Sequence, residues 1–211
     1  MRSVSLLAGR PTAAPRPTGR TLRERGAGLV EFAFVALLLF TLVGGTFDYG
    51  MAWRSGIGAT EGVRTAARIG SNGGKDRATD FNALSGMKSA LTASGLVDGV
   101  ERVVIFRTDN IDGEIPTACK TTATSACQVI TGTAFRTNWE SLAMTSATQT
   151  NGCLNVATYR NWCPTTRNNT QATSEYFGVW VRIRHDYLFP IIGDGVTIER
   201  TAVMRLEPEV E

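Results

Sequence analysis

The stretch that decides the fold is residues 26–47, which read GAGLVEFAFVALLLFTLVGGTF. Glu31 is the single charged residue in this run of 22, and apolar side chains fall on every side of a helix drawn through it. A helix needs about 20 apolar residues to cross a bilayer, so the run is long enough. The alternative is a helix buried in a soluble core, but an arginine-rich arm flanks the run on one side only. The sequence therefore predicts a transmembrane helix, which we place at residues 27–50.

A basic arm, residues 1–26, precedes this run. It holds six arginines and one acid, Glu24, a net charge of +5, and because the whole chain carries +3 the remainder carries −2. The one-sided positive charge predicts that the arm stays in the cytoplasm and that residues 51–211 lie outside the cytoplasmic membrane. Because the basic excess belongs to the arm and not to the folded body, we expect no nucleic-acid partner.

A cleavable secretory signal is a competing interpretation, since its general form is also a basic segment followed by an apolar one. The apolar run here is longer than the 7–15 residues typical of the hydrophobic region of a signal. No small-x-small site followed by a turn stands clearly at its end, and Gly44-Gly45-Thr46 is the nearest candidate. We therefore favour a retained, single-pass anchor.

The remainder of the chain predicts an extracytoplasmic α+β domain. Helical spacing continues through residues 48–70, and residues 76–94 predict a second helix that Gly95 ends. Runs rich in β-branched and alternating apolar residues predict three strands, at residues 100–107, 177–184 and 196–206. The predicted fold is thus a long N-terminal helix packed on a small antiparallel sheet, a pilin-like plan, with a polar insert at residues 109–172.

A stripe of very small residues marks one face of the predicted helix beyond the membrane. Gly58, Gly62, Ala66 and Gly70 follow one another at intervals of four residues, so they share a face. Each glycine weakens an isolated helix by up to about 1 kcal/mol relative to alanine, so this stretch needs a packing partner. We expect that partner to be the C-terminal sheet of the same chain in preference to another subunit.

Four cysteines, Cys119, Cys127, Cys153 and Cys163, all lie in the polar insert. An even number of cysteines outside the cytoplasm predicts disulfides, and three connectivities are possible. We favour the local pairs Cys119 with Cys127 and Cys153 with Cys163. Each bridge would close a short loop and stabilise the folded state by about 2–3 kcal/mol. A zinc site is the alternative, but the C-x7-C and C-x9-C spacings differ from the paired C-x2-C pattern of such sites.

Catalytic and cofactor sites are not expected. His185 is the only histidine, and although it stands beside Asp186 as half of a catalytic dyad would, no nucleophile motif accompanies it. The sequence carries no phosphate loop and no dinucleotide fingerprint. Trp139, Trp162 and Trp180 could form an adhesive surface, although Trp180 alternates with valines as a residue on the second face of a sheet would. We therefore predict no enzymatic activity, no cofactor and no metal.

The most informative residues lie where the chain enters the membrane, at Gly26 and at Glu31-Phe32. A carboxylate inside an apolar segment costs a few kcal/mol unless it is interfacial or paired. Cleavage after Gly26 would place a new α-amino group on Ala27, one helical turn from Glu31, where the two could pair within one subunit or between neighbours. The alternative is that Glu31 reaches the lipid headgroups and Gly26 is an ordinary boundary glycine.

These residues resemble a type IV prepilin processing site, G-x4-E-F followed by an apolar helix. The wider stretch is similar to the TadE-like family of tight-adherence (Flp) pilus assembly proteins. The residues that carry this second likeness are RGAGLVEFA at 25–33, FDYG at 47–50 and EGVR at 61–64, within a region of about 45 residues at 25–68. The leader of 26 residues and Gly28 in the first turn of the mature helix depart from the prepilin pattern.

The resemblance implies a non-enzymatic, minor pilin-like or pseudopilin-like protein of the bacterial envelope. Gly26 would precede the processing site, Ala27 would be the mature N-terminus, and Glu31 with Phe32 would serve assembly. The implied partners are the membrane, other pilin-like subunits, the pilus assembly machinery and a prepilin peptidase. The alternative function is a membrane-anchored binding or adhesion domain that never enters a filament.

Overall fold

The computed structural model describes residues 22–121, 124–137, 150–189 and 193–208. The chain divides into two compact units, Met1–Val43 and Gly44–Glu211. A single helix, α1 (Leu22–Gly73), contributes to both of them. Most of the basic arm, and Trp139 of the suggested adhesive surface, lie outside the described residues.

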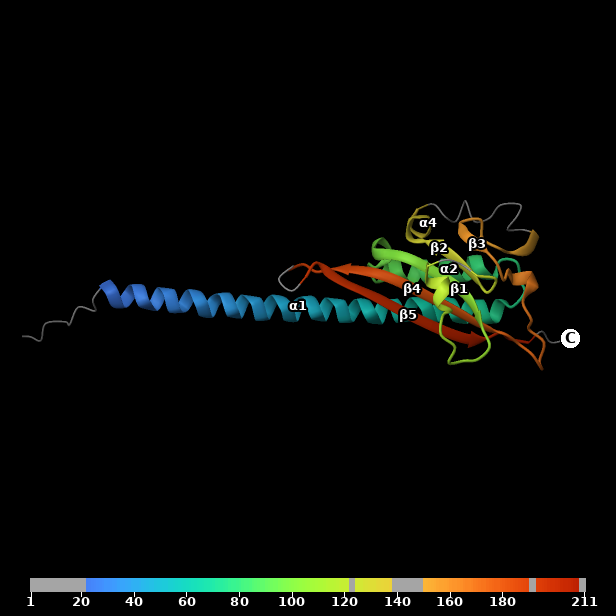
Figure 1. Cartoon of the computed structure of the whole chain (residues 1–211), viewed down its shortest axis with the longest axis horizontal. Helices are drawn as coiled ribbons and strands as arrows, with labels where there is room; N and C mark the ends of the chain where they lie inside the picture. The colour runs from blue at the N-terminus through green and yellow to red at the C-terminus, as the bar shows by residue number, and fades with distance from the viewer. Residues whose placement is uncertain (1–21, 122–123, 138–149, 190–192, 209–211) are drawn as a thin grey trace, which may run out of the picture. The chain divides into compact units, whose positions relative to one another are not determined.

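The second unit is an antiparallel sheet with helices, so the predicted α+β class is confirmed (Figure 1). Its strands run in the order β3-β2-β1-β4-β5. Their bounds are β1 Val100–Thr108, β2 Cys127–Thr131, β3 Ala157–Arg160, β4 Tyr176–Asp186 and β5 Gly195–Arg205. The helical elements of this unit beyond α1 are α2 Thr79–Ala93, α3 Thr117–Thr121, α4 Gly132–Arg136 and the single turns Val97–Gly99 and Pro164–Thr166.

The prediction of three strands was wrong by two. Both additional strands, β2 and β3, come from the polar insert at residues 109–172, where no strand was predicted. They are five and four residues long, so neither is long enough to show a clear alternation of apolar and polar residues. β2 pairs with β1, and Val103 lies opposite Ile130, so neighbouring apolar strands support the short one.

One face of the sheet packs on α1 and α2. Alternate residues of the two central strands point to this face, with Val103 opposite Val181 and Ile105 opposite Val179. The buried helix residues against them are Ala59, Val63, Ala66 and Ala67 of α1 and Ala83, Leu84, Met87 and Leu91 of α2. The second helix begins three residues later than predicted, and Gly95 follows it with a φ of +70°, a left-handed conformation that suits glycine.

The opposite face of the sheet carries a smaller core. Val104, Phe106 and Trp180 lie there under the segment that contains the disulfide between Cys119 and Cys127. Phe106 pairs with Gly178 across β1 and β4, and a Cβ on that glycine would collide with the phenylalanine ring. Trp180 therefore covers the second face, as its alternation with valines predicts, and at 1% exposure it offers no adhesive surface.

An ion-pair cluster borders this smaller core. The carboxylate of Glu199 accepts hydrogen bonds from Arg182 at 2.6 and 2.9 Å and from Lys120 at 3.1 Å. Partial burial raises the pKa of Glu199, but these hydrogen bonds and the two positive charges outweigh it, and the pKa lies below its ordinary value. The cluster therefore ties α3 to β4 and β5.

Candidate functional site

The apolar part of α1 buries no face of its own. From Leu29 to Val43 the large apolar side chains are between 54% and 71% exposed. A helix of this composition in a soluble core would bury at least one side, so this alternative does not fit. Within the part of the chain that the structure describes, α1 is long and apolar enough to cross a membrane.

The predicted processing and assembly residues all lie within this exposed helix. α1 begins at Leu22, so Gly26 and Ala27 stand inside the helix and not at its first residue. Glu31 and Phe32 are exposed, and a side chain built on Gly26 would meet nothing within 4 Å. The site offers space for a partner around both glycine and carboxylate, which is what processing and helix packing need.

Asp48 stands four residues beyond the first unit, and it is only 5% exposed. Its two carboxylate oxygens accept hydrogen bonds from the backbone N–H groups of Leu188 at 2.9 Å and Phe189 at 3.0 Å. The ring of Phe47 meets the ring of Phe189 edge to face, with centroids 6.3 Å apart. Asp48 thus attaches the turn after β4 to α1, a contact that sequence spacing could not reveal because 140 residues separate the partners.

The small-residue stripe has two partners in its own chain. A Cβ on Gly58 would lie 2.9 Å from Ser94, and one on Gly62 would lie 3.0 Å from Leu91, so this part of the stripe admits α2 and the turn after it. A Cβ on Gly70 would overlap the ring of Phe177 in β4. The expectation of a sheet partner holds for Gly70 but was wrong for the other two glycines, because the side chains nearest to them belong to α2 and the turn after it.

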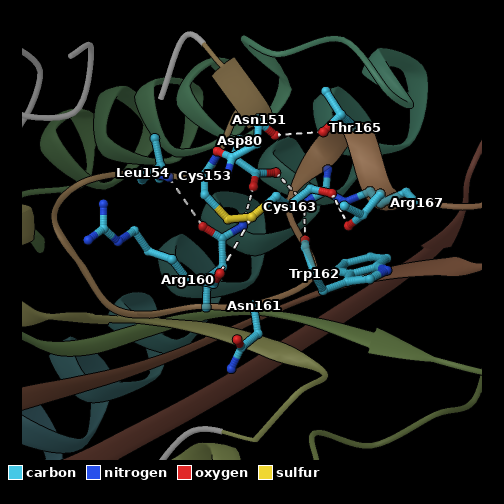
Figure 2. The surroundings of a disulfide bond; sticks show 12 residues. Asp80, Asn151, Cys153, Leu154, Arg160, Asn161, Trp162, Cys163, Thr165 and Arg167 are labelled. Carbon is cyan, nitrogen blue, oxygen red and sulfur yellow. Dashed lines mark hydrogen bonds and ion pairs between the residues drawn. A yellow bond between two sulfur atoms is a disulfide. The ribbon is translucent and has the colours of Figure 1, made fainter. Parts of the chain in front are cut away.

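Both disulfides lie in the second unit. The structure joins Cys119 to Cys127 and Cys153 to Cys163, which are the two local pairs that the sequence favours. The first pair covers the outer face of the sheet and the second lies near α2, where Figure 2 shows it beside Asp80. No group of three or more potential metal ligands occurs among the described residues.

A buried ion pair lies beside the second disulfide (Figure 2). Nη2 of Arg167 donates to Oδ1 of Asp80 at 2.6 Å, and both side chains are fully buried. The guanidinium also stacks on the rings of Trp162 and Phe177, 4.3 and 4.9 Å from their centroids, and its Nε and Nη1 have no hydrogen-bond partner among the described residues. Gln128 completes the cluster by donating to the Asp80 carboxylate.

Burial raises the pKa of Asp80, and the charge of Arg167 with the two hydrogen bonds opposes that rise. The cluster joins α2 to the segment after the second disulfide, across 87 residues of sequence. Its side chains are buried and hydrogen-bond to one another, so we interpret it as a structural lock. Removing one partner of such a buried pair strongly destabilises a protein, because the other charge is then left buried and unpaired.

His185 does not form a dyad with Asp186. The carboxylate of Asp186 pairs instead with Nε of Arg184 at 3.0 Å. Nδ1 of His185 lies 3.2 Å from Oγ of Ser55, whose hydroxyl also donates to the carbonyl of Met51 in the same helix. The histidine therefore tethers β4 to α1.

Comparison with known protein families decides what the exposed helix is. Residues 26–68 match the family model described as TadE-like protein. The chain carries a TadE-like segment. No curated protein matches the chain significantly, and no solved structure does so either.

The TadE-like segment coincides with α1 and confirms the resemblance noted from the sequence. It contains Gly26, Glu31 and Asp48, and it ends at Arg68, two residues before Gly70 meets Phe177. All five strands and both disulfides lie beyond it. The TadE-like segment therefore supplies the exposed apolar helix and one wall of the core, while the rest of the second unit follows from residues that the family model does not cover.

Proposed function

We propose that this chain is a minor pilin-like subunit, without enzymatic activity, of a tight-adherence pilus assembly system. The observation that supports it best is that the TadE-like match falls on a helix that leaves its apolar side chains exposed. Proteins with such segments take part in pilus assembly and are in general not enzymes. The helix anchors the protein in the cytoplasmic membrane, with the basic arm inside and the disulfide-bonded unit outside.

Glu31 sets the register between this subunit and its neighbours in our proposal. A prepilin peptidase cuts after Gly26, and the new α-amino group of Ala27 lies one helical turn, about 6 Å along the axis, from Glu31. A charged carboxylate at the centre of a membrane helix costs about 2.5–3.5 kcal/mol on insertion scales, and pairing with an amine removes much of that cost. Only one axial offset between two packed helices brings amine and carboxylate together, so the pair selects that offset.

The test compares two substitutions in the same helix. Glu31→Leu should leave the protein inserted but reduce its co-purification with the pilus fraction, about tenfold if the pair contributes about 1.4 kcal/mol to association. Thr41→Leu is the matched control, because it also replaces a polar side chain of the helix. The Thr41 hydroxyl donates to the carbonyl of Leu37 one turn before it in the same helix. The control should co-purify as the wild type does.

N-terminal sequencing of the membrane-extracted protein completes the test, and the expected first residue is Ala27. An unprocessed terminus together with normal co-purification of Glu31→Leu would refute the charge-pair mechanism. That result would favour the alternative, an anchored binding or adhesion domain that stays out of filaments. A reporter fused after Glu207 should be active only outside the cytoplasm, and activity inside would refute the orientation.

A further inference from the structure

The turn after β4 contacts α1 near the start of the second unit. Its backbone donates two hydrogen bonds to Asp48, and the ring of Phe189 meets the ring of Phe47. The carboxylate of Asp48 is buried by these contacts, so it presents little negative charge to the surface. Leu188 and Phe189 are therefore attached to α1 beside Asp48.

This arrangement leaves a set of large apolar side chains facing solvent. We call them the exit patch, defined as Phe47, Tyr49, Trp53, Leu188 and Phe189. Their exposed fractions run from 45% for Phe189 to 69% for Tyr49 and Leu188, and four of the five are aromatic. Phe47 contacts Phe189, and Tyr49 contacts Trp53. Phe47 and Tyr49 are two residues apart on the helix, so they point to different sides of it. The exposed apolar side chains therefore lie around α1 within residues 47–53, and this much apolar surface indicates a partner that surrounds the helix.

The position of the patch in the chain identifies the partner. A spanning helix that starts at Ala27 uses about 20 residues to cross the hydrocarbon, which brings the chain to its outer boundary near Phe47. Tryptophan and tyrosine concentrate at this boundary in membrane proteins, because their rings are apolar while their N–H and O–H groups reach water. Along the sequence, the first residue of the exit patch, Phe47, stands four residues after Val43, the last residue of the exposed apolar run.

We propose that the exit patch is a second membrane contact, in which the turn at residues 187–189 inserts into the headgroup and acyl boundary of the outer leaflet. Asp48 is the positioning residue, since it holds the turn beside α1 at the level where the helix leaves the lipid. The contact fixes the orientation of the extracytoplasmic unit on the bilayer. The inference rests on the membrane insertion that the proposed function includes.

The test places a fluorescent reporter in the turn of the full-length chain, reconstituted as single copies in lipid nanodiscs. Leu188→Trp is made in a Trp53→Phe background, so that the added signal is the difference from that background. Ile111→Trp is the matched control, because Ile111 is also exposed, at 53%, but lies beyond the opposite end of the sheet. Lipids brominated at shallow acyl positions quench tryptophans that enter the boundary, and iodide quenches those in water.

We expect the brominated lipids to remove most of the fluorescence added by Leu188→Trp and none of that added by Ile111→Trp, with the opposite order for iodide. Adding Asp48→Ala should release the turn, so that the tryptophan at position 188 loses lipid quenching and gains iodide quenching. Resistance of the chain to carbonate extraction should stay unchanged, since α1 still spans the bilayer.

Three results would overturn the inference. A tryptophan at position 188 that iodide quenches and lipid does not would show a turn in water. A tryptophan at position 188 that neither reagent quenches would show that other parts of the same chain cover the turn. A chain that carbonate extracts would remove both this inference and the membrane anchor of the proposed function, whereas an inserted chain with an unquenched turn would remove this inference alone.

Discussion

Removing the two disulfides separately should reveal how much the buried ion pair depends on its neighbour. The variants are Cys119→Ala with Cys127→Ala, and Cys153→Ala with Cys163→Ala. The bridged residues are 8 and 10 positions apart. In the chain-entropy model, loops of these lengths contribute about 2.5 and 2.7 kcal/mol to the free energy of unfolding. Loop entropy alone therefore predicts almost equal losses.

The surroundings of the two bridges differ, and the structure predicts unequal losses for that reason. Cys163 is flanked by Trp162, whose ring stacks on the buried guanidinium of Arg167, and three residues separate that arginine from Cys163 (Figure 2). Loosening this segment weakens the hydrogen bond to Asp80, and a hydrogen bond to a charged group contributes about 1.5–3 kcal/mol. The second double variant should lose about 4 kcal/mol, roughly 1.5 kcal/mol more than the first.

Guanidinium denaturation of the full chain in detergent micelles measures both losses, with the fluorescence of the buried Trp162 and Trp180 as the signal. A conservative check is Arg167→Met in each background, which removes the pair directly. Its cost should be smaller where the second disulfide is already gone, because the two changes weaken the same contacts. Equal losses for the two bridges, with additive costs for Arg167→Met, would refute this reasoning.

Two further predictions concern packing and pH. Gly70→Ala should destabilise the second unit by about 1–3 kcal/mol in thermal unfolding, because the new Cβ would overlap the buried ring of Phe177. Gly50→Ala is the control and should be neutral or stabilising, because a Cβ there would meet nothing within 4 Å. Equal effects of the two substitutions would refute the close contact. The lowered pKa of Glu199 contributes stability above the unfolded value of about 4.3, and this is lost as the pH falls through the folded value. The stability difference between wild type and Glu199→Gln should therefore be largest at neutral pH and shrink on acidification, and a difference that grows in acid would contradict it.

The parts of the fold that sequence could predict are those whose signal is local. The exposed run at residues 29–43, the second helix with Gly95 after it, and the three longer strands each carry their own periodicity or stop residue. β2 and β3 have five and four residues, and β2 depends on β1 and β3 on β2 for hydrogen bonds, so their formation is decided by tertiary pairing. Local patterning cannot show such dependence.

The contacts that organise the site were beyond sequence reasoning for a related reason. Asp48 reads as one residue of an FDYG motif, and nothing in its neighbourhood identifies the backbone of Leu188 as its partner. Asp80 and Arg167 are likewise separated by most of the second unit. A charged residue predicted to lie on a helix is usually solvated, so only the three-dimensional packing distinguishes these two carboxylates from the ordinary ones.

The small residues of α1 explain why a helix whose first part is apolar and exposed can also serve, in its second part, as the wall of a core. Gly58 and Gly62 let α2 approach the backbone of α1, and Gly70 lets Phe177 of β4 do the same. Larger side chains at these positions would hold α2 and the sheet away and open the core around Val63 and Ala66. Close packing thus replaces the apolar bulk that the first part of the helix leaves exposed. The change from bulky to small residues along α1 therefore marks where the exposed apolar run ends and where the helix begins to pack on its own chain.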